Sequence, residues 1–112
     1  MTPDDEISHV HSLQTLNLLS EYDDFMESID TVVDLGCGAG LDLEWWATRT
    51  TREDTPQPLN IDCIGVDLND HLPIAKKYSN ITYQSTDFET TIYPKKDTKF
   101  DVLWCHDAFQ YA

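Results

Sequence analysis

Three short apolar runs and one run of alternating apolar and polar residues have the length and composition of β-strands. The alternating run is the third, in which Ile81 and Tyr83 have polar neighbours. The segment after the first run has apolar residues at helical spacing, and the segment after the second begins with N-cap residues and a proline, which predicts a helix in each. The predicted strands lie at residues 32–35, 61–67, 80–84 and 100–112, with 102–104 as the buried part of the last, and the helices at 41–49 and 69–79.

The segment before the first strand also has a helical pattern. Its apolar residues recur every three or four positions from Ile7 to Met26, after an acidic start. This spacing predicts a helix over most of the segment, with its apolar face packed in the core. The chain, whose length fits one domain, therefore consists of a leading helical segment, residues 1–29, and the domain proper, residues 30–112.

A glycine-rich stretch, "VVDLGCGAG" at residues 32–40, follows directly from the first strand. It holds Gly36, Gly38 and Gly40, three of the four glycines of the chain. Glycine loses more backbone entropy on folding than any other residue, so this density indicates a tight turn or the close approach of another group. A strand, a glycine loop and a helix in this order would aim free backbone N–H groups at a ligand.

The acid before these glycines bears on the kind of ligand. The dinucleotide fingerprint G-x-G-x-x-G is not matched, because its third glycine position is Leu41. Asp34, two residues before Gly36, would repel a pyrophosphate and favour a ligand with positive charge, such as an ammonium or a sulfonium. The alternative is a tight strand–helix turn that binds nothing.

"VVDLGCGAG" resembles the first motif of the class I S-adenosylmethionine-dependent methyltransferases, an acid, any residue and then G-x-G-x-G. Asp34, Gly36, Gly38 and Gly40 match this pattern. The resemblance implies an α/β fold with a Rossmann-like, doubly wound and mostly parallel sheet. It also implies S-adenosyl-L-methionine as cofactor, bound along the loop that includes Cys37.

The second strand ends in an acid that suits a ribose. A carboxylate can accept two hydrogen bonds from a diol, and doubly wound folds place such an acid there. The resemblance puts Asp67 on the ribose hydroxyls and Leu68 against the adenine face. Alternatively, Asp67 caps the following helix, although Asn69 or Asp70 could do this.

The third strand leads into "STDFE", residues 85–89. In the methyltransferases an acid after this strand accepts from the exocyclic amine of adenine, and an apolar neighbour packs on the ring. Asp87 and Phe88 match these places. The alternative is that Asp87 is an acid in a turn and Phe88 is a residue of the hydrophobic core, with no role in binding.

The segment 100–112 is similar to the fourth motif of the methyltransferases, with its F-D-V opening. Ligands of open parallel sheets bind beyond the carboxyl ends of the strands. Cys105, His106 and Asp107 are therefore expected near the methionine part of the cofactor and the methyl acceptor. His106 is a candidate general base. The alternative is a spectator histidine bonded to the backbone, which is the more frequent role of a lone histidine at a strand end, and many such enzymes need no base and rely on positioning.

The resemblance covers about residues 30–112 and implies an incomplete sheet. The methyltransferase sheet has seven strands, whereas four are predicted here. We expect the cofactor-binding half of the fold, truncated after its fourth strand, with most of the acceptor pocket absent. The exposed edge of that strand would then invite self-association or a second chain.

The expected function is methyl transfer to a small-molecule acceptor. Two alternatives remain at this point. The chain could be a non-catalytic module that binds S-adenosylmethionine or S-adenosylhomocysteine, or it could be a fragment of an NAD-type oxidoreductase. Asp34 and the spacing of Gly40 argue against the second.

The net charge of −14 and the isoelectric point near 4.2 exclude some classes of binding partner. Nucleic acids and anionic membranes call for basic patches, and the two lysine doublets, at 76–77 and 95–96, are too sparse for one. Neither partner is expected. The sequence shows no signal peptide or membrane-spanning segment, so a cytoplasmic protein is predicted.

Histidines and cysteines favour neither a metal site nor a disulfide. His9 and His11 are two positions apart and would face different sides of a helix. Cys37, Cys63 and Cys105 form an odd set without C-x-x-C spacing, which indicates free thiols in a reducing compartment.

Overall fold

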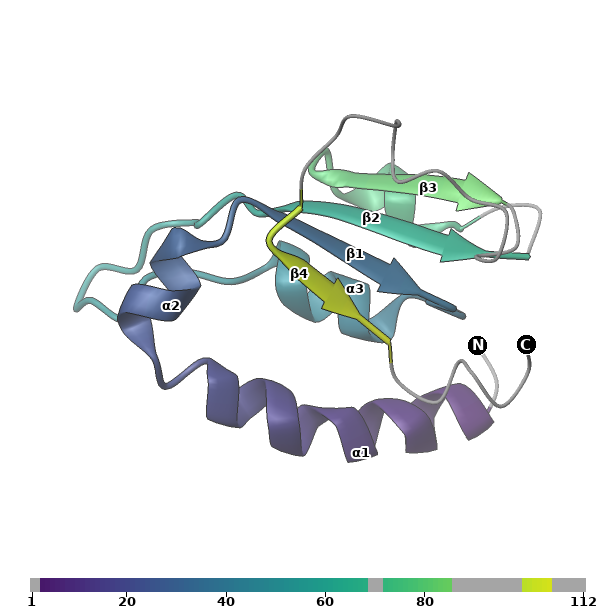
Figure 1. Ribbon diagram of the computed structural model, residues 1–112, viewed down its shortest axis with the longest axis horizontal. Helices are drawn as coiled ribbons and strands as arrows, with labels where there is room; N and C mark the ends of the chain where they lie inside the picture. The colour runs from purple at the N-terminus through teal and green to yellow at the C-terminus, as the bar shows by residue number, and fades with distance from the viewer. Residues whose placement is uncertain (1–2, 69–71, 86–99, 106–112) are drawn as a thin grey trace.

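The computed structural model describes residues 3–68, 72–85 and 100–105, and all four predicted strands are present in these ranges. A helix follows each of the first two strands, as predicted, but the second spans only Ile74–Lys77, with Pro73 as its N-cap residue in place of Asn69 or Asp70 (Figure 1). In chain order the elements are α1 (Pro3–Leu19), α2 (Asp23–Ser28), β1 (Thr31–Leu35), α3 (Leu41–Ala47), β2 (Asp62–Asp67), α4 (Ile74–Lys77), β3 (Ile81–Ser85) and β4 (Val102–Trp104).

The four strands form one sheet in the order β3-β2-β1-β4, and every pairing is parallel. Val33 in β1 lies opposite Ile64 in β2 and Leu103 in β4. The prediction of an α/β, Rossmann-like fold with a parallel sheet is confirmed. The chain moves outward from β1 through β2 and β3, whereas β4 lies on the other side of β1. The carboxyl ends of β1 and β4 therefore flank the topological switch point, where open α/β sheets bind ligands.

Both faces of β1 and β2 are buried, which explains their almost continuous apolar sequences. On one face Val32 joins a large cluster with α1, α2 and α3, to which Leu16, Met26 and Trp46 contribute. On the other face Val33, Leu35, Ile64 and Val66 form a second cluster, and Cys105 packs against it.

The leading segment differs from the prediction in two ways. It forms two helices, because the chain turns between Leu19 and Asp23. The apolar residues of α1 also lie on more than one face: Leu16 is fully buried, whereas Val10 and Leu18 are more than half exposed. The apolar spacing therefore overestimated how much of α1 packs in the core. Within the described ranges, no helix is both long and apolar enough to cross a membrane.

The fourth strand is less buried than predicted. Val102 and Trp104 are half-buried, but Leu103 is 50% exposed, so the prediction of a buried run at 102–104 is wrong at its centre. The sheet order explains this, because β4 lies at an edge and pairs with β1 on one side. Asp101 fixes the start of β4, since its carboxylate accepts from the N–H groups of Asp30 at 2.7 Å and Thr31 at 3.1 Å.

Candidate functional site

The glycine loop requires backbone conformations that residues with a side chain rarely adopt. The φ angles are +68° at Gly36, +55° at Gly38 and +85° at Gly40. All three lie in the left-handed region, where a Cβ costs energy. A Cβ on Gly40 would also come within 2.9 Å of Ile74 Cγ2 in α4. The three glycines are thus explained by the path from β1 into α3.

The N–H groups of this loop donate largely within the chain. Those of Gly36 and Cys37 donate to the carbonyl of Val66, at 2.7 and 3.1 Å, and that of Gly40 donates to the carbonyl of Cys37 at 2.9 Å. Gly38 N–H donates to Asp67 Oδ2 at 2.8 Å. The expectation of free N–H groups aimed at a ligand is wrong for these four. The loop is consequently not a phosphate cradle, which would need them.

Asp67 lies at the carboxyl end of β2, directly beside the glycine loop. Besides the bond to Gly38, its Oδ1 accepts from the N–H of Leu68 at 2.7 Å. It does not cap α4, whose N-cap residue is Pro73. Asp67 is half-buried and Leu68 is 72% exposed, so both are reachable from solvent at this edge.

Asp34 is a buried carboxylate near the end of β1, with 3% exposure. Within the described part of the chain, its Oδ2 is buried and has no hydrogen-bond partner. Burial, and then the negative charges of Asp42 and Asp67, raise the pKa of Asp34 well above its usual range. A buried acceptor without a donor costs free energy, so this position would gain from a cationic hydrogen-bond donor.

Asp42, which the sequence analysis did not single out, is a meeting point of three elements. Its Oδ1 accepts from His9 Nδ1 at 2.5 Å and from Ser12 Oγ at 2.6 Å, both on α1. Its Oδ2 accepts from Trp104 Nε1 on β4 at 2.9 Å. These partners are 30 to 62 residues away in sequence, so no local spacing could have revealed them.

The thiol of Cys37 points into the core beneath the loop. A Cβ built on Gly65 of β2 would lie 3.0 Å from Cys37 Sγ and 2.8 Å from Leu43 Cδ2 of α3. Gly65, the fourth glycine, therefore makes room for the loop and α3. Burial, followed by the charges of Asp34 and Asp67, strongly raises the pKa of the Cys37 thiol, which keeps it protonated and unreactive.

The other predicted site residues are distributed differently. Cys105 packs against the second apolar cluster, on the face of the sheet away from the helices. All three cysteines are free thiols, as predicted, and burial raises the pKa of Cys63 to about 12. Asp87, Phe88 and His106 lie outside the described residues.

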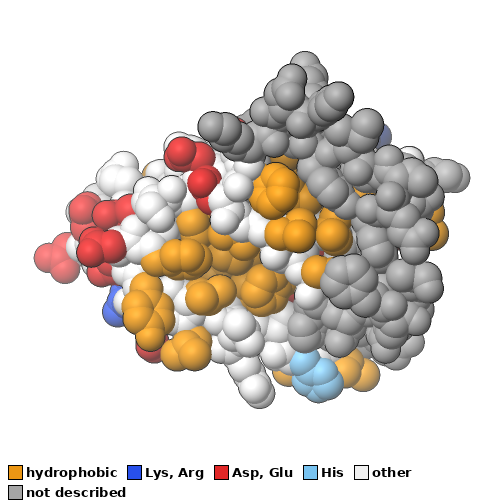
Figure 2. All heavy atoms as spheres, in the orientation of Figure 1, with side chains coloured by type: hydrophobic (Ala, Val, Ile, Leu, Met, Phe, Trp, Pro, Cys, Tyr) orange, Lys and Arg blue, Asp and Glu red, His pale blue; other side chains and the backbone are white. Residues whose placement is uncertain are grey.

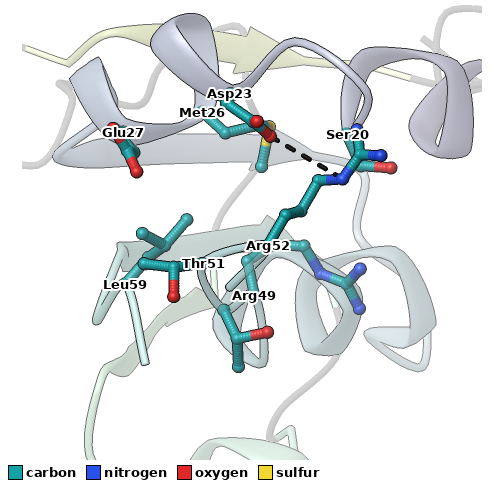
Figure 3. Close-up of a pocket in the computed structure, with 9 residues that line it drawn as sticks. Ser20, Asp23, Met26, Glu27, Arg49, Thr51, Arg52 and Leu59 are labelled. Carbon is teal, nitrogen blue, oxygen red and sulfur yellow. Dashed lines mark ion pairs between the residues drawn. The ribbon is translucent and has the colours of Figure 1, made fainter. Parts of the chain in front are cut away.

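A cavity of about 240 Å³ lies at the end of the sheet where the strands begin, opposite to the carboxyl ends that flank the glycine loop (Figure 3). It is bounded by α2 and the segment 49–59. Arg52 reaches across it to Asp23, with 3.7 Å between Nε and Oδ1, while Arg49 stacks on the Trp45 ring at 4.0 Å. Among the residues that line this cavity, no side-chain nitrogen or oxygen is both buried and without a hydrogen-bond partner, in contrast to Asp34 Oδ2.

Comparison with known protein families assigns most of the chain to a family. The family model described as a methyltransferase domain matches residues 33–112, from β1 through the glycine loop to β4 and beyond. No curated protein and no solved structure matches the chain.

Proposed function

The chain belongs to the methyltransferase domain family, and from that premise we propose that it binds S-adenosyl-L-methionine at the carboxyl ends of β1 and β2. We further propose that the bound cofactor serves methyl transfer to a small-molecule acceptor. When bound, the cofactor supplies an electrophilic methyl group on a positively charged sulfur. The chain supplies the charge, shape and orientation that hold it.

The observation that carries this proposal is the buried carboxylate of Asp34. Its Oδ2 has no donor within the described residues, and Asp42 and Asp67 add negative charge around it. S-adenosylmethionine carries an ammonium and a sulfonium. A cation brought here would stabilise the ionised form of Asp34 and satisfy a buried acceptor.

Asp67 and Leu68 suit the nucleoside part of the cofactor. The carboxylate of Asp67 accepts two backbone N–H bonds, and a carboxylate has further lone pairs for a diol. Leu68 presents an exposed apolar side chain on which a base could pack. Gly36 and Gly38 have no Cβ, so a ligand could approach the backbone of the loop closely at these two positions. An NAD-type pyrophosphate suits this edge less well, because the loop N–H groups donate elsewhere and three acids lie nearby.

Calorimetric titration of the 112-residue chain with S-adenosylmethionine, S-adenosylhomocysteine and NAD tests the proposal. We expect saturable binding of the first two and none of NAD. Asp34→Asn should lower the affinity for S-adenosylmethionine by about tenfold or more, since a charge-assisted hydrogen bond is worth roughly 1.5–3 kcal/mol.

Asp62→Asn is the matched control, because Asp62 is an exposed acid at the start of β2 and the substitution is the same. Its affinity should stay within about twofold of the wild type. Equal losses in both variants would mean that only overall charge matters. Unchanged affinity in Asp34→Asn would remove Asp34 from the site.

A further inference from the structure

A histidine and a carboxylate form a pair beside the proposed cofactor site. His9 Nδ1 lies 2.5 Å from Asp42 Oδ1, and the side chains are 22% and 13% exposed. Ser12 and Trp104 also donate to Asp42, so three donors hold its carboxylate. Among the residues described, no second partner of the His9 ring is found.

The pair lies at the switch point of the sheet. Asp42 is the second residue of α3 and follows the glycine loop directly, while Trp104 is the last residue of β4 and lies opposite Asp34 in the register. Figure 1 shows the N-terminal end of α1 at the same end of the molecule as the tips of the strand arrows. His9 is thus near the edge where ligands of such sheets bind.

The hydrogen bond determines what the imidazole can do. When neutral His9 donates its Nδ1–H to Asp42, the lone pair is on Nε2, and Nε2 can accept a proton. The carboxylate then stabilises the imidazolium that forms, as an acid does behind a catalytic histidine. Ser12 and Trp104 keep that carboxylate in place from α1 and β4.

We propose that His9, oriented by Asp42, is the general base of this enzyme and that the methyl acceptor is a hydroxyl compound. This rests on the proposed function. The hydroxyl oxygen attacks the methyl carbon with a lone pair, the carbon–sulfur bond breaks and leaves its electrons on sulfur, and the hydroxyl proton passes to His9 Nε2. A hydroxyl needs such a base because it is a weak nucleophile until its proton leaves. A neutral amine is a good nucleophile while it still holds its protons and needs no base for the attack.

An electrophilic cofactor analogue tests the position of His9 without a known acceptor. The probe carries an aziridinium ring in place of the methyl sulfonium. Attack by Nε2 on a ring carbon opens the carbon–nitrogen bond, leaves the electron pair on the ring nitrogen and joins the analogue to His9. Peptide mass spectrometry then locates the label.

We expect labelling at His9, faster than at exposed His11 by about 100-fold or more, because a bound probe reacts at high effective concentration. Excess S-adenosylhomocysteine should prevent it. Asp42→Asn should slow the labelling, and His11→Gln should not. Nitrogen NMR of the free chain should show neutral His9 as the Nδ1–H form in the wild type and a mixture of both forms in Asp42→Asn.

A purely structural tether between α1 and α3 would give different results. Label on other residues, equal label on His9 and His11, or no label in a chain that binds S-adenosylhomocysteine would overturn the proposal for His9 while the proposed function stands. Absence of S-adenosylhomocysteine binding by calorimetry would contradict both.

Discussion

Asp34 links the sequence motif to the physical chemistry of the site. Its carboxylate is buried on the helix-covered face of the sheet, close to two other acids, and its pKa is raised well above the usual range. In the unliganded chain the ionised carboxylate of Asp34 is therefore destabilising. A cationic ligand at this position would stabilise that ionised form. Binding and stability oppose each other at this residue.

Asp34→Asn should stabilise the free chain in a pH-dependent way. Since the folded state holds the proton more tightly, wild-type stability falls as pH rises above the unfolded pKa, about 3.9, and keeps falling until the folded pKa is passed. The variant lacks this loss, so its gain in Tm over the wild type should grow from about pH 4 upward. Thermal unfolding at several pH values checks this, and a constant difference would argue against the raised pKa.

Gly65→Ala should destabilise the chain by about 1–3 kcal/mol, because the added methyl group overpacks the space below Cys37 and Leu43. Denaturant unfolding measures the loss. Leu43→Ala should partly relieve it, so the double variant should lose less than the sum of the two single losses. Additive losses would mean that the two side chains do not compete for this space.

The residues that could be singled out from the sequence are those that form one short motif, Asp34, Gly36, Gly38 and Gly40. The positive φ angles account for the three glycines of this motif. The role of Asp42 depends on contacts from α1 and β4, which only the fold brings together.

Among the secondary-structure elements, Asp42 of α3 connects this helix to α1 and β4. Two of its three donors, His9 and Ser12, fix the polar side of α1, whereas the apolar contact of α1 runs through Leu16 and its half-buried neighbours Leu13 and Leu19. Loss of this carboxylate should therefore loosen α1 more than the sheet.

Asp42→Ala should cost about 1–3 kcal/mol, because the donors on Ser12, His9 and Trp104 lose their shared acceptor. Hydrogen exchange should show faster exchange of the α1 amides, with β1 and β2 much less affected. Asp24→Ala, at an exposed acid of α2, serves as the control and should leave α1 unchanged. Equal protection of α1 in all three proteins would show that the apolar contacts suffice.

Strands were easier to predict than their surroundings. Apolar runs located β1 and β2, because parallel strands covered on both faces have few polar residues. The alternation of Ile81 and Tyr83 with polar neighbours located β3, and a short apolar run located β4. The turn between α1 and α2 has neither glycine nor proline to mark it. The exposure of Leu103 depends on β4 lying at the edge of the sheet, which an apolar pattern does not encode.

The surface of the molecule exposes several large apolar side chains, although the chain has a large net negative charge. Exposed hydrophobic side chains gather on the face shown in Figure 2. Among the described residues, the exposed large hydrophobic side chains of α1, α2, β4 and their flanks include Leu18, Tyr22, Phe25, Phe100 and Leu103, each at least 37% exposed. The net charge of −14 opposes association of two copies.

We propose that the edge of β4 nevertheless pairs with a second copy of the isolated 112-residue chain. Sedimentation at micromolar concentration should show self-association that increases with salt, because salt screens the repulsion. Leu103→Lys should reduce it, since a charged side chain opposes pairing at an edge strand. A wild-type chain that stays monomeric at every salt concentration would contradict this proposal.

The position of the bound cofactor directly tests whether the glycine loop, Asp34 and Asp67 form the binding site. A crystal structure of the chain with S-adenosylhomocysteine should place the ligand over Gly36–Gly40, with its ribose hydroxyls within hydrogen-bond distance of Asp67 and its ammonium on the side of Asp34. Ligand in the cavity between α2 and the segment 49–59, or an empty carboxyl edge at saturating ligand, would contradict the account.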